Sequence, residues 1–236
     1  MLKILIAPDS FKGSLTSPEV ARIIDCALAE SISHAETVQY PLADGGEGTT
    51  EIVSPYLSED VCLIESATLI GLNLSKMRSL DVLQRGSGAL GEAMMEGLDF
   101  GKREFVVGLG GSATNDGGLG MLMVLGMQAF DKYSMPVKPD LSGLLSLVRI
   151  DISDLSPRLS ESRLTILSDV VSPLCGKNGA TALYGPQKGL RSSEVGRVDQ
   201  AMRKFARLCG NAVGFDPATH EGAGAAGGIG FALMLL

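Results

Sequence analysis

Four groups of residues in this 236-residue chain combine glycine with side chains that could do chemistry. One is Asp44-Gly-Gly-Glu-Gly48, which places the carboxylates of Asp44 and Glu47 on a permissive backbone. Paired carboxylates of this kind can hold Mg²⁺ through oxygen. The alternative is a tight turn whose acids are solvated. We expect the metal-binding interpretation to hold if the loops that follow the other predicted strands lie at the same edge of the sheet.

The densest glycine run is Gly-Leu-Gly-Gly-Ser-Ala-Thr-Asn-Asp-Gly-Gly, over residues 108–118. Backbone N–H groups and hydroxyls ahead of a helix suit an anion such as phosphate. The candidate ligands for that anion are Gly110, Gly111, Ser112, Thr114 and Asn115. The carboxylate of Asp116 could hold a metal or orient a substrate hydroxyl. A simple turn with an N-cap is the alternative, which so dense a glycine run disfavours.

Two further clusters follow predicted strands. Asp9, Ser10 and Lys12 come directly after an apolar run, and Lys12 could meet a phosphate or carboxylate as a point charge. An ordinary turn explains that cluster equally well. Asp169 ends another apolar run, and Gln187 and Lys188 lie in a Gly/Pro turn, where Lys188 is a phosphate candidate.

The run Gly222-Ala-Gly-Ala-Ala-Gly227 matches G-x-G-x-x-G, but its context is wrong for a dinucleotide fingerprint. No apolar strand precedes it, and the acid expected about 20 residues further on is absent. A nicotinamide-dependent oxidoreductase is therefore a weaker alternative. We interpret the run as the entry to a helix, with Gly224 and Gly227 as candidate ligand contacts.

The elements that must position these clusters alternate between strand and helix. Apolar runs predict strands over 2–7, 37–42, 61–65, 104–109 and 164–167. Helical spacing predicts a helix that starts at Thr16 with a capping box to Glu19, and helices over 88–98, 118–130 and 193–209, the last with Ser193 as N-cap. This alternation predicts an α/β fold. Loops after parallel strands would gather their residues at one sheet edge.

Composition excludes several classes of function. The formal net charge of −7 disfavours binding to nucleic acid, and the absence of Trp disfavours base stacking. Four scattered cysteines and two histidines argue against a zinc site. The N-terminal apolar run is too short for a signal peptide, and the longest uncharged stretch is too short for a membrane span. We expect a cytoplasmic protein without a membrane partner.

Glycine-rich anion loops, acids and lysines without a P-loop or protein-kinase signature fit phosphoryl transfer to a small polar molecule. Five stretches in order also closely resemble the bacterial type 1 glycerate kinase family. They are APDSFKGSLTSPEVA (7–21), PLADGGEGT (41–49), GLGGSATNDGGLGML (108–122), SDVVSPLCGKNGATALYGPQKG (168–189) and GAGAAGGIG (222–230).

The resemblance implies ATP-dependent phosphorylation of D-glycerate with Mg²⁺, with 2-phosphoglycerate favoured over 3-phosphoglycerate as the product. It implies a two-lobed α/β fold with the active site in the cleft between the lobes. Residues 1–60 would form a Rossmann-like lobe, with 229–236 starting its C-terminal return, and residues 61–228 would form the inserted α/β lobe. ATP and D-glycerate are the expected partners, and a homodimer is allowed.

The residues carried over from these motifs lead to hypotheses about their roles. Lys12 and Lys188 would meet the glycerate carboxylate or phosphates, and Asp44 and Glu47 would help to hold Mg²⁺. Either Asp169 or Asp116 would orient the attacking hydroxyl, with Asp169 the first choice because it ends a strand.

The sequence departs from the family in two places. Compared with the family pattern, a block is missing between Ile52 and Val61, and the portion that would follow Phe231 is missing too. A non-catalytic binding relative, or a truncated inactive form, is therefore the alternative function.

Overall fold

The strand framework of the computed structural model, which describes residues 2–236, consists of two parallel sheets and one short antiparallel pair. The first sheet pairs β1 (Leu2–Ile6) with β2 (Ala35–Gln39). The second has the order β3-β4-β7 and contains β3 (Val61–Glu65), β4 (Glu104–Gly108) and β7 (Arg163–Leu167). The antiparallel pair joins β5 (Gln128–Phe130) to β6 (Arg149–Asp151). The predicted α/β class is confirmed.

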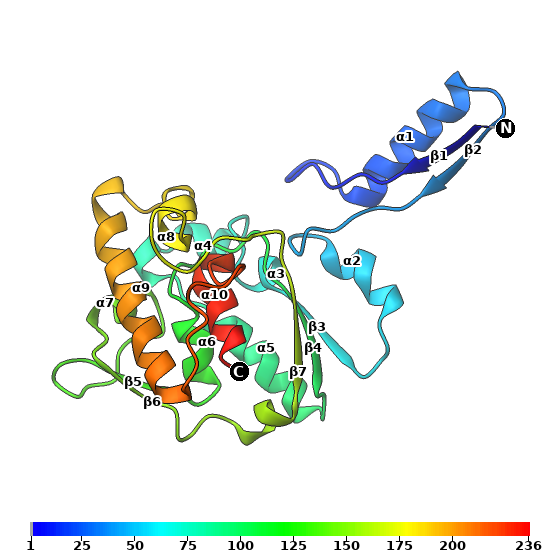
Figure 1. Ribbon diagram of the computed structural model, residues 1–236. Helices are drawn as coiled ribbons and strands as arrows, with labels where there is room; N and C mark the ends of the chain where they lie inside the picture. The colour runs from blue at the N-terminus through cyan, green and yellow to red at the C-terminus, as the bar shows by residue number, and fades with distance from the viewer. Residues whose placement is uncertain (1) are drawn as a thin grey trace.

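Helices alternate with these strands, and most of them lie beside the three-stranded sheet. Figure 1 shows α5, α6 and α10 on one side of that sheet, with α9 outside them. The α-helices are α1 (Ser17–Ser31), α2 (Thr49–Val53), α3 (Ser66–Ile70), α4 (Ser75–Ser79), α5 (Gly88–Asp99), α6 (Leu119–Val124), α7 (Leu141–Ser146), α8 (Ala180–Tyr184), α9 (Ser192–Val213) and α10 (Ala225–Met234). Short 3₁₀ helices are η1 (Ser54–Tyr56), η2 (Val82–Gln84), η3 (Pro157–Glu161) and η4 (Pro186–Lys188).

The core lies between the three-stranded sheet and these helices. Phe205 of α9 and Phe231 of α10 meet edge to face, with ring centroids 6.1 Å apart, and both side chains are fully buried. The C-terminal helix α10, which contains most of residues 229–236, packs against α6, α8 and β7. The apolar composition of α10 explains this, because its side chains find the largest apolar interior there. The division of the chain near residue 60 stays a prediction.

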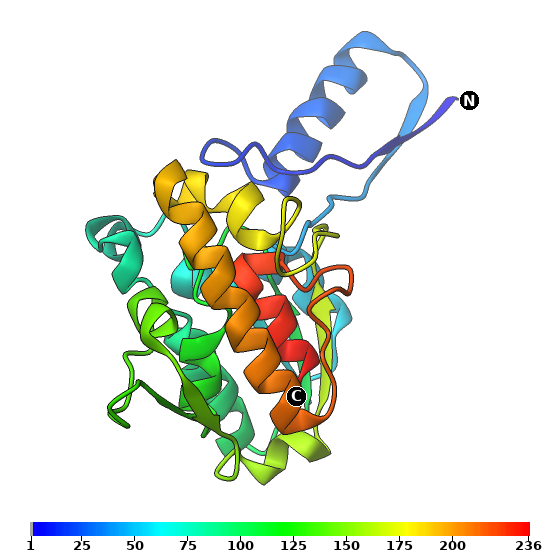
Figure 2. The ribbon, with the colours of Figure 1, turned by 60° about the vertical axis from the view of Figure 1, so that its left-hand side comes forward.

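The unit formed by β1, β2 and α1 stands apart from the rest of the chain in both views (Figure 1, Figure 2). The predicted capping box is confirmed, because the Thr16 side chain accepts from the Glu19 N–H and the Glu19 carboxylate accepts from the Thr16 N–H. The expected apolar face of α1 is largely uncovered, and Ile23 is 47% exposed. Leu5 of β1 is 66% exposed. Apolar strands of this kind are typical of parallel sheets covered on both faces, whereas this sheet has a single helix against it.

Two sequence-based boundaries were wrong. The helix predicted over 118–130 ends at Val124, and the chain then turns at Gly126 (φ +115) into β5. A Cβ at Gly126 would lie 2.1 Å from the Asp154 carbonyl oxygen, so the turn requires glycine. The N-cap of α9 is Arg191, not Ser193, and the Glu194 carboxylate accepts from the Arg191 N–H at 3.1 Å. Within residues 2–236, no helix is long and apolar enough to cross a membrane.

The loop after β2 lies directly on the end of β4 and β7, with glycine on both sides of the contact. The Gly110 N–H donates to the Gly45 carbonyl at 2.9 Å. A Cβ at Gly110 would lie 2.4 Å from the Gly46 Cα, and one at Gly45 would lie 2.4 Å from the Leu167 carbonyl oxygen. The two backbones therefore approach so closely that no residue other than glycine fits at the contact.

A buried carboxylate reinforces this contact from β3. Glu65 is 4% exposed and accepts from the backbone N–H groups of Gly48 and Thr50 and from the Thr50 hydroxyl, at 2.9–3.0 Å. It therefore occupies the N-terminus of α2, where the helix dipole favours negative charge. The loop that carries Asp44 is thus held at both of its ends.

Asp116 joins the glycine-rich loop to two helices inside the core. Its carboxylate accepts from the N–H and hydroxyl of Ser87, both at 2.8 Å, and from the N–H groups of Gly118 and Gly120. Its side chain is fully buried, and this burial raises the pKa of the Asp116 carboxyl against the opposing effect of the hydrogen bonds. Asp116 therefore caps the starts of α5 and α6.

We expect Gly110→Ala to lower the free energy of unfolding by about 2 kcal/mol, because the added methyl group would overlap the backbone at Gly46. Urea denaturation measures this effect. The matched control is Gly196→Ala in α9, where a Cβ would meet nothing within 4 Å and alanine favours the helix. Equal stability of Gly110→Ala and the parent chain would contradict the close contact.

Replacement of Asp116 by alanine should cost at least about 3 kcal/mol of folding free energy, because it leaves several buried N–H donors without an acceptor. The control is Asp151→Ala, which removes a half-buried acid whose side chain bonds only to Ser153 two residues away. Thermal and urea unfolding should show a small change for the control. A similarly small change for Asp116→Ala would refute the capping role.

Candidate active site

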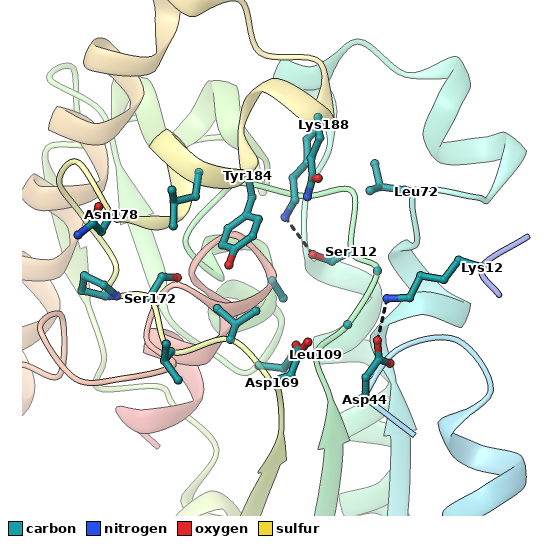
Figure 3. Close-up of a pocket in the computed structure, with 18 residues that line it drawn as sticks. Lys12, Asp44, Leu72, Leu109, Ser112, Asp169, Ser172, Asn178, Tyr184 and Lys188 are labelled. Atoms are coloured by element: carbon teal, nitrogen blue, oxygen red, sulfur yellow. Dashed lines mark hydrogen bonds and ion pairs between the residues drawn. The ribbon is translucent and has the colours of Figure 1, made fainter. Parts of the chain in front are cut away.

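A cavity of about 540 Å³ opens where β4 and β7 end. This volume lies in the range of small-molecule sites, and the carboxyl ends of parallel strands are where open α/β sheets bind ligands. Figure 3 shows its lining side chains. Eight residues singled out from the sequence meet there: Lys12, Asp44, Gly110, Gly111, Ser112, Asp169, Gln187 and Lys188.

Lys12 and Asp44 form an ion pair at one end of the cavity. Lys12 follows β1 and Asp44 follows β2, so the parallel pairing of these strands brings both loops to one edge. The Lys12 ammonium donates to Asp44 Oδ2 at 2.7 Å (Figure 3). This hydrogen bond raises the pKa of Lys12. Burial disfavours ionised Asp44, but hydrogen bonds from Lys12 and the Gly46 N–H outweigh it and lower the Asp44 pKa.

Lys188 reaches the cavity from η4 (Figure 3). Its side chain is 4% exposed, and its ammonium donates to Ser112 Oγ at 3.1 Å and to the Thr114 carbonyl at 2.7 Å (Figure 3). Burial lowers the pKa of Lys188 to about 7. Arg85 donates to the carbonyl of Lys188 at 2.8 Å, which holds this part of the backbone in place.

Asp169 lies two residues beyond β7, on the strand side of the cavity and across from Lys188 (Figure 3). Its side chain is exposed. The Asp169 charge is also close enough to contribute to the raised pKa of Lys12, after the larger effects of Asp44 and Asp9. The predicted position of Asp169 at a strand end is therefore also a position facing the ligand space.

Three predicted residues lie near a different cavity. Asp9, Ser10 and Glu47 line a neighbouring space of about 290 Å³ on the other side of Lys12. Glu47 Oε2 accepts from Asn73 Nδ2 at 3.0 Å. The structure therefore does not bring Glu47 to the cavity that Asp44 lines.

Five predicted residues lie behind the cavity wall rather than in it: Thr114, Asn115, Asp116, Gly224 and Gly227. The carboxylate of Asp116 is taken up by the caps of α5 and α6. Gly227 packs so that a Cβ would lie 2.1 Å from the Thr114 carbonyl oxygen, and Gly224 packs in the same way on Ser172. These two glycines serve close packing, and their neighbour Ala226 lines the cavity instead.

Sequence reasoning missed several lining residues, which are Leu72, Leu109, Val170, Val171, Ser172, Pro173, Asn178, Leu183, Tyr184 and Ala226. No local signal marked Tyr184, because Gly185 and Pro186 separate the end of α8 from Gln187 and Lys188. The Ser172 hydroxyl is buried and has no hydrogen-bond partner within residues 2–236. An unpaired buried hydroxyl beside a cavity is suited to a polar ligand.

The fit of Mg²⁺ depends on the acids in the cavity. Within the described chain, no group of three or more His, Cys, Asp or Glu side chains could enclose a metal ion. Asp44 and Asp169 both line the cavity. Proteins commonly hold Mg²⁺ through one or two carboxylates together with substrate phosphates. The residues present therefore fit an ion that arrives with a phosphate ligand.

Comparison with known proteins agrees with this chemistry. A sequence profile described as the glycerate kinase family matches residues 4–61 and 54–236. A glycerate kinase from Haemophilus influenzae is 39% identical over 260 aligned positions, covering 100% of this chain and 69% of the relative. A glycerate 2-kinase from Escherichia coli is 37% identical and covers 99% of this chain and 68% of the relative.

A solved structure supports the same relationship. The crystal structure of a protein designated glycerate kinase 2 from Salmonella typhimurium LT2 superposes with a TM-score of 0.82 at 37% identity. The match covers 99% of this chain and 69% of that chain. This chain thus spans about two thirds of the length of its relatives, and it contains the lysines, the carboxylates and the glycine-rich loop that meet in the cavity. The chain belongs to the glycerate kinase family.

Proposed function

We propose that this glycerate kinase uses ATP to phosphorylate D-glycerate in the 540 Å³ cavity. The observation that carries the proposal is the meeting of two lysines, two carboxylates and a glycine-rich loop around one space of ligand size. Phosphoryl transfer needs positive charge and N–H groups around phosphates and a carboxylate near the accepting hydroxyl. Each of these groups is present at the cavity wall.

Asp169 is the proposed base. The hydroxyl oxygen of glycerate forms a bond to the γ-phosphorus as the bond to the bridging oxygen of ADP breaks, and Asp169 accepts the hydroxyl proton. An exposed carboxylate at the end of β7 can approach a bound hydroxyl, whereas the carboxylate of Asp116 is committed to buried N–H groups. We therefore assign the base to Asp169 alone.

The remaining cavity residues would bind the charged groups of the substrates and the metal ion. Lys12 and Lys188 reach the cavity from different elements and are suited to the glycerate carboxylate and to phosphate oxygens. The Gly110–Gly111–Ser112 segment is suited to a phosphate through its backbone and hydroxyl. Asp44 would hold Mg²⁺ together with the substrate phosphates, and the ion when bound neutralises charge on phosphate oxygens. Glu47 does not line this cavity, so it would contact the metal only after a movement of its loop.

The 2-hydroxyl is the proposed acceptor, so the product would be 2-phosphoglycerate. The name of the Escherichia coli relative, glycerate 2-kinase, supports this choice over the 3-hydroxyl. Phosphorus NMR of the product distinguishes the two positions. We further propose a cytoplasmic location, consistent with four free cysteines, and a homodimer, which light scattering of the purified chain would test.

The activity itself is tested by ADP release with ATP, Mg²⁺ and D-glycerate, with L-glycerate as the control. We expect release that depends on the D-isomer. Folded chain that binds D-glycerate and ATP without releasing ADP would instead identify a non-catalytic relative. Failure of either ligand to bind would refute the proposed function.

Asp169→Asn should lower kcat by at least about 100-fold, because the amide keeps the shape of the side chain but cannot accept the hydroxyl proton. The free energy of unfolding should change little, since the Asp169 side chain is exposed. Asp60→Asn, which alters an exposed acid outside the cavity, is the matched control. An Asp169→Asn variant with the parent kcat would remove Asp169 from the mechanism.

A further inference from the structure

Lys188 is the one buried basic side chain in residues 2–236. Its ammonium has three N–H donors, and two of them go to neutral oxygens, Ser112 Oγ and the Thr114 carbonyl. None of the carboxylates in the described chain forms a salt bridge with it. A buried cation without an anionic partner is costly, so the charged form of Lys188 lacks the group that would stabilise it.

The charged groups around Lys188 do not supply an anionic partner for its ammonium. Behind it, Asp116 raises the pKa of Lys188, but this effect is smaller than that of burial, and its carboxylate already accepts from Ser87. Arg85 bonds to the backbone carbonyl of Lys188 and adds a second positive charge nearby. From α8, the Tyr184 phenol lines the same space.

The two carboxylates across the cavity do not pair with Lys188 either. Asp44 is paired with Lys12 at 2.7 Å. Asp169 lies on the strand side, and Figure 3 shows the open cavity between it and Lys188. An anion entering this space would therefore be the first negative charge in direct contact with the Lys188 ammonium.

We propose that the cavity binds its anionic ligand together with a proton, and that Lys188 carries this proton. The inference rests on the proposed function only for the identity of the natural anion, the carboxylate or phosphate of a kinase ligand. The geometry that supports it is the buried ammonium, its two neutral partners and the cavity beside it. Lys12 is a contrast within the same site, because its ion pair with Asp44 keeps it charged before any ligand arrives.

The sign of the pH dependence follows from burial. Burial lowers the pKa of Lys188 to about 7 in the empty site, and a bound anion raises it again. At pH 6 the lysine is already charged, so binding takes up about 0.1 proton. At pH 8 it is mostly neutral, so binding takes up about 0.9 proton and the affinity is about tenfold weaker than at pH 6.

The test is titration calorimetry of the unmodified chain at pH 6 and pH 8, each in two amine buffers with different ionisation enthalpies. Sulfate and D-glycerate are the ligands, because neither changes its charge between these pH values. The difference in measured enthalpy between buffers gives the protons taken up for each anion bound. Uptake near 0.9 at pH 8 and near 0.1 at pH 6 supports the proposal.

Two matched variants assign the proton to one lysine. Lys188→Met keeps the length of the side chain but has no ionisable group, so its weaker binding should show neither proton uptake nor pH dependence. Lys12→Met should also bind more weakly, yet keep the uptake and the tenfold ratio. Uptake that disappears with Lys12 instead would overturn the assignment.

The outcomes separate this inference from the proposed function. Binding of D-glycerate without proton uptake at pH 8 overturns the inference and leaves the kinase proposal standing. Sulfate binding with uptake in a chain that does not bind D-glycerate supports the inference and refutes the kinase proposal. Binding of neither anion overturns both. Because the unmodified chain supplies the first result, a variant that fails to fold does not prevent a decision.

Discussion

The contact between two glycine-bearing backbones, Gly45–Gly46 and Gly108–Gly110, is the constraint on which the cavity depends. It brings the loop after β2 onto the ends of β4 and β7 without any side chain between them. Glu65 holds the other end of that loop through buried N–H groups. Because Asp44 lies on this loop and Asp169 follows β7, this backbone contact determines how far apart the two residues lie in the chain's fold.

The two lysines of the cavity show how environment changes the chemistry of one side chain. Lys12 is largely exposed and paired with Asp44, so it contributes a permanent charge that is partly neutralised before a ligand arrives. Lys188 is buried among neutral oxygens, and burial lowers its pKa to about 7. Lys12 therefore attracts anions over a wide pH range, whereas the protonation of Lys188 depends on whether an anion is bound.

The sequence predicted the α/β class, most strands and the gathering of loop residues at one sheet edge, because apolar runs and glycine-rich turns are local signals. It could not predict that Glu47 would face away from Asp44, since both lie on a glycine-rich loop whose path depends on contacts with β4 and β7. The role of Asp116 was equally hidden, because its hydrogen-bond partner Ser87 is 29 residues away in the chain. The end of α6 depended on a contact of Gly126 with Asp154, which spacing does not reveal.

The exposed apolar side chains of β1 and α1 have a consequence for the cavity. A two-stranded parallel sheet with a helix on one side buries little apolar surface, so this unit has little internal support. It also carries Lys12, and the loop that follows it carries Asp44. Local unfolding of this unit would withdraw Lys12 and loosen Asp44 from the cavity wall, while the core of α5, α6, α9 and α10 stays folded. A ligand that contacts Lys12 therefore binds only the folded form of this unit and shifts its folding equilibrium. Amide hydrogen exchange in β1 and β2 would slow as the ligand occupies the site.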